Sequence, residues 1–205
     1  MPVNLTQAIA GPSTLSRSSA LWLRYKAKAL LVLGLRSRAV SVFQEILALA
    51  PDDKLALNSL GYEAMTHGRM LEAMGFFERL VHQTPNECNA HFNLGFVREA
   101  LGHSEDAEHA FRTAIRLDEK MDRAWYGLGL ALVRQRRFEE SLQAFQRNTQ
   151  LQSMSPFAWY QMARVHIEMN QPDEALAVMR HLSGFEPKVA AQLERETGLK
   201  LNSPA

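Results

Sequence analysis

The strongest constraint on this chain is a pattern of small and aromatic residues that returns every 34 residues. Two sets of residues keep this interval: Gly61, Gly95 and Gly129, and Phe77, Phe111 and Phe145. Within one interval, Gly68 separates two stretches with apolar residues at helical spacing, so each interval predicts two helices joined by a turn. A helix with one apolar face needs a partner to cover it, so these helix pairs are expected to stack.

The interval divides most of the chain into five helical hairpins. Their predicted bounds are residues 20–53, 54–87, 88–121, 122–155 and 156–189, and each hairpin contains a first helix, A, and a second helix, B. Pro51, Pro85 and Pro187 mark boundaries, because proline lacks a backbone donor and disfavours helix in the residue before it. Five hairpins in one phase predict an all-α fold.

The two ends of the chain depart from this pattern. Residues 1–18 have no helical period and are rich in Ser, Thr, Pro and Gly, which predicts a flexible arm. Ser18 or Ser19 is expected to cap the first helix. Residues 188–205 are expected to form a capping helix and a tail, with the helix ending at Gly198.

Small residues recur where the two helices of a hairpin are expected to cross. They are Ala27, Gly61, Gly95, Gly129 and Ala163 on the A helices, and Ala39, Ala73, Ala107, Ser141 and Ala175 on the B helices. A larger side chain at these positions would push the helix axes apart, and packed interiors absorb such volume poorly. The phenylalanines of the B helices, Phe43 included, are expected to fill the gap to the next hairpin.

These residues and their spacing resemble the tetratricopeptide repeat family, whose helix A signature appears here as Trp125-x-x-Leu128-Gly129. The resemblance covers about residues 20–189 and implies a right-handed α-solenoid that binds proteins. Some positions depart from the family pattern, namely Lys26 and His91 in the A helices, Arg136 in a turn, and Glu119 and Ser153 at closing prolines. These departures weaken single repeats without changing the register.

The resemblance also implies that the A helices line a concave groove, with positions two, five, six, nine and twelve of each repeat pointing into it. The residues predicted to bind a peptide there are Arg24, Lys28, Asn58, Tyr62, Phe92, Asn93, Phe96, Arg123, Tyr126, Tyr160 and Arg164. Aromatic and arginine side chains dominate binding hot spots, and asparagine offers a donor and an acceptor to a peptide backbone. The alternative is that these rings only pack on neighbouring A helices.

We therefore predict a non-enzymatic adaptor or chaperone that binds an extended, acidic-apolar peptide segment of a partner protein. A five-residue carboxylate clamp, known from some family members, fits poorly, because Asn58, Tyr62 and Gly127 do not suit three of its positions. The alternative function is a scaffold that assembles head to tail into a homo-oligomer, with the N-terminal arm in a neighbour's groove.

The sequence shows few features of enzymes, metal-binding proteins or membrane proteins. It holds no phosphate-binding glycine loop, no catalytic serine motif and no paired His or Cys at metal-ligand spacing, so we expect no enzyme, cofactor or metal site. No apolar run approaches the roughly 18 residues of a membrane span. A single cysteine, Cys88, favours a reducing, cytoplasmic location.

Charge is balanced over the whole chain but not along it. The net charge of +1 argues against nucleic acid as a partner. Residues 1–50 carry six basic residues and one acidic residue, a balance of +5, and the remainder carries 17 − 21 = −4. The basic end could attract an acidic partner, and the alternative is an ordinary solvated helix face.

Overall fold

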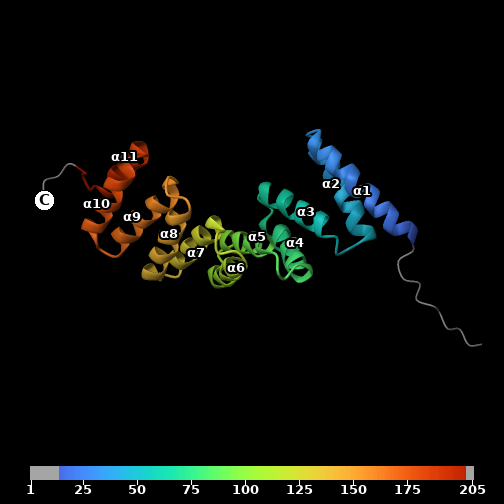
Figure 1. Ribbon diagram of the computed structural model, residues 1–205, viewed down its shortest axis with the longest axis horizontal. Coiled ribbons are helices and arrows are strands. Elements are labelled where there is room, and N and C mark those ends of the chain that lie inside the picture. Colours follow the sequence, from blue (N-terminus) through green and yellow to red (C-terminus); the bar gives the residue numbers. More distant parts are fainter. Residues whose placement is uncertain (1–13, 202–205) are drawn as a thin grey trace, which may run out of the picture. The chain divides into compact units, whose positions relative to one another are not determined.

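In a computed structural model the described residues, 14–201, form eleven α-helices and no strand (Figure 1). The prediction of an all-α fold of helical hairpins is confirmed. Most of the predicted N-terminal arm, residues 1–13, lies outside the described residues.

The helices pair in chain order, close to the predicted bounds. The hairpins are α1 (Thr14–Val32) with α2 (Arg36–Leu49), α3 (Lys54–Thr66) with α4 (Met70–Gln83), α5 (Cys88–Ala100) with α6 (Ser104–Leu117), α7 (Asp122–Arg134) with α8 (Phe138–Leu151), and α9 (Pro156–Glu168) with α10 (Pro172–Ser183). The last helix, α11 (Pro187–Thr197), packs on α9 and α10 and ends at Gly198 in the left-handed conformation, as predicted.

The start of the first helix differs from the prediction. Helix α1 begins at Thr14, so the boundary expected at Ser18 or Ser19 is wrong. After Gly11 and Pro12, no glycine or proline follows before Gly34, so nothing in the sequence interrupts a helix that starts at Thr14.

The chain divides into two compact units, residues 1–84 and 85–205. In the first unit, Phe43 and Phe77 are fully buried, and a Cβ added to Gly61 would lie 2.7 Å from the Phe77 ring. Such a distance is far below van der Waals contact, so only glycine allows α3 and α4 to cross this closely. The prediction of small residues at the helix crossing is confirmed here.

The second unit repeats this packing and adds to it. Cβ atoms added to Gly95 and Gly129 would lie 2.9 Å from the Phe111 ring and 2.4 Å from the Phe145 ring, within their own hairpins. A Cβ on Gly127 of the next hairpin would also lie 2.6 Å from the Phe111 ring. Phe111 therefore fills both the space within its hairpin and the gap to the following one.

The turns inside the hairpins use the left-handed backbone conformation. Gly34, Gly68 and Gly102 have φ angles of 74°, 73° and 82°. Arg136 and Asn170 take the same place in the next two hairpins with φ angles of 59° and 57°. A side chain strains this conformation, and arginine is less suited to it than asparagine.

Between hairpins, a ring nitrogen of helix A bonds back to the connecting loop. The Nε1 of Trp125 donates to the carbonyl oxygen of Glu119 at 2.9 Å, and the Nε1 of Trp159 to that of Ser153 at 3.0 Å. The Nε2 of His91 lies 2.9 Å from the carbonyl oxygen of Pro85. His91 departs from the family pattern, yet it makes the same contact to the sixth residue before it.

Candidate functional site

The A helices are α1 and α3 in the first unit and α5, α7 and α9 in the second. Repeat positions are counted from residues 20, 54, 88, 122 and 156. Position nine is exposed in four of the five repeats. There Lys28 and Arg164 are exposed, and the exposed fractions of Tyr62 and Phe96 are 37% and 45%. These aromatic rings are available to a ligand within their own units.

Side chains at position five are half-buried, because the aromatic ones pack against phenylalanines of the core. The centroid of Phe92 lies 5.9 Å from that of Phe111, and the centroid of Tyr126 lies 5.8 Å from that of Phe145. Phe92 also lies 6.5 Å from Phe96, centroid to centroid. These two position-five residues therefore support their own hairpins and expose only part of each ring.

Position six departs from the prediction in the third and fourth repeats. Asn93, predicted to bind a peptide backbone, is only 2% exposed. Gly127, at the same position, is buried against the Phe111 ring. Gly127 shows the reason in the fourth repeat, because it lies against Phe111 of the preceding hairpin and that hairpin covers it. The predicted groove role of Asn93 is not compatible with this burial.

Arg24 holds the first two A helices together. Its Nε donates to the Oδ2 of Asp53 at 2.6 Å, and its guanidinium also forms an ion pair with that carboxylate. Asp53 is buried, and its Oδ1 accepts a hydrogen bond from the backbone N–H of Ala56, which caps α3. Arg24 therefore has a structural partner already, unlike the exposed Lys28.

Arg123 is engaged in a similar way in the second unit. Its guanidinium donates to the Oδ1 of Asn89 at 2.5 Å, and its Cζ lies 4.7 Å from the centroid of the Phe92 ring. Both partners are on α5, so the contact joins two successive A helices and covers one side of Phe92. A ligand approaching Phe92 would meet this arginine as well.

Tyr160 connects α9 to the capping helix. Its hydroxyl donates to the Oε2 of Glu196 at 2.5 Å, and Arg164 lies over its ring with 5.9 Å between Cζ and centroid. The hydrogen bond to the carboxylate, followed by burial, raises the pKa of Tyr160. Hydrogen bonds from Tyr160 and Gln192 lower the pKa of Glu196.

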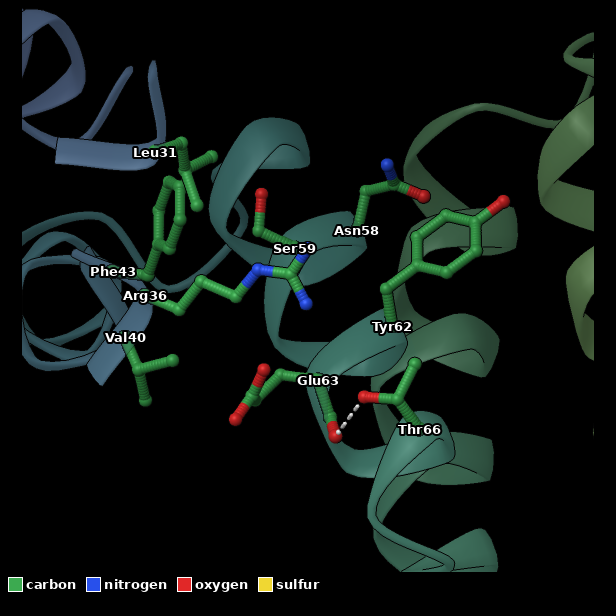
Figure 2. A pocket seen from close by; sticks show the side chains of 9 residues that line it. All are labelled: Leu31, Arg36, Val40, Phe43, Asn58, Ser59, Tyr62, Glu63 and Thr66. Atoms are coloured by element: carbon green, nitrogen blue, oxygen red, sulfur yellow. Dashed lines mark hydrogen bonds between the residues drawn. The ribbon is translucent and has the colours of Figure 1, made fainter. Parts of the chain in front are cut away.

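A pocket of about 310 Å³ lies beside Tyr62 in the first unit (Figure 2). It is lined by Leu31, Arg36, Val40, Phe43, Asn58, Ser59, Tyr62, Glu63 and Thr66. Figure 2 shows the Arg36 guanidinium reaching from α2 toward Ser59 of α3. Within the described part of the chain, no side chain forms an ion pair with Arg36. The pocket thus combines an apolar wall with a cation and the Asn58 amide.

A pocket of about 340 Å³ occupies the same place in the repeat frame of the second unit. Six of its lining residues follow six of the first pocket by 102 residues, which is three 34-residue intervals: Val133, Phe138, Gln161, Arg164, Val165 and Glu168 correspond to Leu31, Arg36, Ser59, Tyr62, Glu63 and Thr66. Its cations differ, because it also contains Arg134, which pairs with Glu99, and Arg136, whose Cζ lies 5.5 Å from the centroid of the Phe138 ring. The fold therefore forms a hollow at the same junction in both units.

Sequence reasoning missed several residues of the first pocket, above all Arg36 and Glu63. Arg36 belongs to a B helix, whereas the prediction considered only A helices. Glu63 and Thr66 follow Ser59 and Tyr62 by four residues, a spacing that places them on one helix face. That spacing could have identified both, but only the structure shows Arg36 beside them.

Two other kinds of site find no support in the described residues. Nowhere in residues 14–201 does a helix combine the length and the apolar character needed to cross a bilayer. In the same residues, no group of three or more His, Cys, Asp or Glu side chains is placed to hold a metal ion.

Comparison with protein families agrees with this architecture. Tetratricopeptide repeat family models match residues 26–87, 92–151 and 158–188. The chain belongs to the tetratricopeptide repeat family. Proteins of this family are generally interaction modules rather than enzymes. A comparison with curated proteins returned no match.

Solved structures with the same fold include several repeat proteins. YrrB, described as a tetratricopeptide repeat protein with an unusual peptide-binding site, is 18% identical with a TM-score of 0.78, over 90% of this chain and 100% of YrrB. A MamA structure is 19% identical with a TM-score of 0.74, over 80% of this chain and 96% of that one. A thermophilic repeat protein of Thermus thermophilus is 20% identical with a TM-score of 0.63, over 88% of this chain and 100% of that one. At these identities the likeness concerns the fold.

Proposed function

We propose that this protein is a non-enzymatic interaction module that binds an extended peptide segment of a partner protein along its A helices. The observation that carries the proposal is the exposure of Tyr62 and Phe96 at the same position of two repeats. Burying such rings contributes about 25 cal/mol per Å² of apolar surface, which makes them suitable anchors.

The chemistry around the first anchor indicates what kind of segment would fit. Beside Tyr62 the pocket offers the Arg36 guanidinium and the Asn58 amide. A segment with an apolar side chain next to a carboxylate would place the first against Tyr62 and the second against Arg36. Arg164 lines the matching pocket of the second unit, so an acidic residue is favoured there as well.

Similar proteins support the class of function. YrrB, whose description names a peptide-binding site, has the same fold over its full length. The proposal also includes a reducing, cytoplasmic setting, for which the single cysteine of the sequence is the support.

Affinity capture with a groove variant tests the proposal. The double variant Tyr62→Ala/Phe96→Ala removes both anchors and, by hot-spot magnitudes of about 2 kcal/mol or more per ring, should abolish capture of protein partners from native lysate. The matched control is Leu71→Ala/Met154→Ala, which truncates two exposed apolar side chains outside the A helices. Circular dichroism checks that both variants keep their helices. Capture that survives in the groove variant would rule the proposal out.

Head-to-tail self-assembly is the second candidate function, and it has less support. Such stacking needs an apolar surface at the last helix, whereas the exposed face of α11 carries Lys188, Gln192, Arg195 and Glu196. Light scattering over a concentration series separates the two functions. A strict monomer at all concentrations argues for the peptide-binding module.

A further inference from the structure

The outer face of α1 exposes large apolar side chains that the proposed groove does not use. Trp22 is 61% exposed and Tyr25 is 68% exposed, and Val32 and Leu33 continue the exposed stripe toward the end of the helix. The spacing of Trp22, Tyr25, Ala29 and Val32 places them along one side of a helix. The opposite side, with Leu23 and Ala27, is buried in the core of the first unit.

In three later repeats, the corresponding face of helix A packs against the preceding B helix. Trp22 occupies position three, where α3, α7 and α9 carry the buried residues Ala56, Ala124 and Ala158. Each of these alanines belongs to a core cluster that includes residues of the preceding B helix, α2, α6 or α8. At this face, the fold therefore receives a helix in three repeats, whereas none of the described residues covers the same face of α1.

The charge around this face is of one sign. Lys26 stands beside the stripe, with its Nζ 5.2 Å from the centroid of the Trp22 ring, and Lys28 is exposed on the other edge. The sequence contains no Asp or Glu before Glu45. A partner that covers Trp22 and Tyr25 would therefore gain from carrying negative charge.

We propose that an acidic amphipathic helix of a partner protein docks on this face of α1, in the place that a preceding B helix takes on α3, α7 and α9. Because Trp22 and Tyr25 are large where the other repeats have small residues, the docking helix presents alanine or glycine opposite them. Its glutamates flank that stripe and face Lys26 and Lys28. The face shares Lys28 with the predicted groove, but Trp22, Tyr25 and Lys26 do not line the pocket beside Tyr62.

Two other occupants fit this face less well. A second copy of the chain, paired through α1, would bring the same lysines together with no carboxylate on α1 to balance them. An anionic lipid surface is usually met by clusters of four to eight basic residues, roughly, whereas only Lys26 and Lys28 are uncommitted on the described part of α1, since Arg24 pairs with Asp53.

A pair of synthetic helices provides the test. The probe is a peptide of about 20 residues, long enough for helix formation, with alanines on one stripe and glutamates on both sides of it. The control peptide has lysines in place of the glutamates. We expect the acidic peptide to bind the full chain at least about tenfold more tightly, measured by fluorescence anisotropy at low salt.

Variants of the full chain locate the binding. Trp22→Ala should weaken the acidic peptide about tenfold by removing the central ring, and Lys26→Glu should shift the preference toward the lysine peptide. Lys54→Glu, an exposed lysine on α3, is the matched control and should change neither affinity. Tyr62→Ala should leave this binding intact, which separates the proposal from the groove function.

The proposal is overturned by any of three results. The first is equal or no binding of the two peptides. The second is binding of anionic lipid vesicles that Lys26→Glu abolishes, without binding of the acidic peptide. The third is a dimer in analytical ultracentrifugation that Trp22→Ala dissociates, because a second copy then covers the face.

Discussion

Contact between glycine and phenylalanine at a helix crossing is the detail on which each hairpin depends. A Cβ on Gly129 would lie 2.4 Å from the Phe145 ring, which is fully buried, so the ring or the backbone would have to shift. We expect Gly129→Ala to destabilise the protein by about 1–3 kcal/mol through overpacking, although alanine is the better helix former. Urea unfolding followed by circular dichroism measures the change.

Gly75 provides the matched control for this prediction. It also lies inside a helix, but a Cβ there would meet nothing within 4 Å. Gly75→Ala should therefore stabilise the protein by about 1 kcal/mol, from helix propensity alone. If both alanine variants moved stability in the same direction, the packing explanation would be wrong.

Arg136 is a second residue at which the backbone conformation predicts the effect of a substitution on stability. Its φ of 59° belongs to the left-handed region, where three other turns have glycine. Arg136→Gly should stabilise the protein by about 1 kcal/mol, because the strain of a side chain in this conformation is relieved. The reverse change in an equivalent turn, Gly102→Ala, should destabilise it. Thermal unfolding of the two variants tests the pair.

At the level of helices, a set of charged side chains connects α6, α8 and the turn before α8. Glu108 bonds to the Nε of Arg112 at 2.8 Å and to the Nη1 of Arg137 at 2.6 Å, and Arg137 bonds in turn to Glu140. Burial alone would raise the pKa of Glu108, but the hydrogen bonds from Arg112 and Gln135 and the two guanidinium charges outweigh it. The net effect holds this pKa below its ordinary value of 4.5.

This lowered pKa predicts how stability depends on pH. Above pH 4.5 Glu108 is ionised in both the folded and the unfolded chain, so its contribution is fully present. As the pH falls through 4.5 toward the lower folded pKa, the unfolded chain takes up the proton first and the contribution is lost. Glu108→Gln should therefore flatten the decline of unfolding free energy in acid, as measured by urea unfolding at a series of pH values. An unchanged slope would contradict the prediction.

The sequence was sufficient to predict the helices. It was sufficient to predict only part of which side chains are accessible on their surface. Helix bounds followed from Gly68 and Gly102, which form the turns with positive φ, and from the prolines of residues 14–201, which stand between helices or at their first position. The burial of Asn93 could not be inferred, since residues at position six range from 2% exposed for Asn93 to 68% exposed for Tyr25. Pairing of Arg24 with Asp53 depends on two residues 29 apart that only the packed hairpin brings together.

For the whole molecule, stability should be distributed repeat by repeat, because each repeat packs mainly on its neighbours. The core residues of the first unit and those of the second form separate clusters. Gly129→Ala should therefore reduce hydrogen-exchange protection in α7 and α8 and leave α1 and α2 unchanged. Exchange followed by mass spectrometry measures this helix by helix. Loss of protection in α1 as well would indicate that the chain opens as one unit.

The bond from a helix A ring to a loop carbonyl has a consequence for how such chains can vary. The ring nitrogens of His91, Trp125 and Trp159 recognise main-chain oxygen, and the residues that supply it are Pro85, Glu119 and Ser153. Because every amino acid has this oxygen, the loop is free to change its side chain while the junction stays intact. A designer who wished to place a new chemical group between two repeats could therefore introduce it at residue 119 or 153 without losing the hydrogen bond from the ring nitrogen to the loop carbonyl.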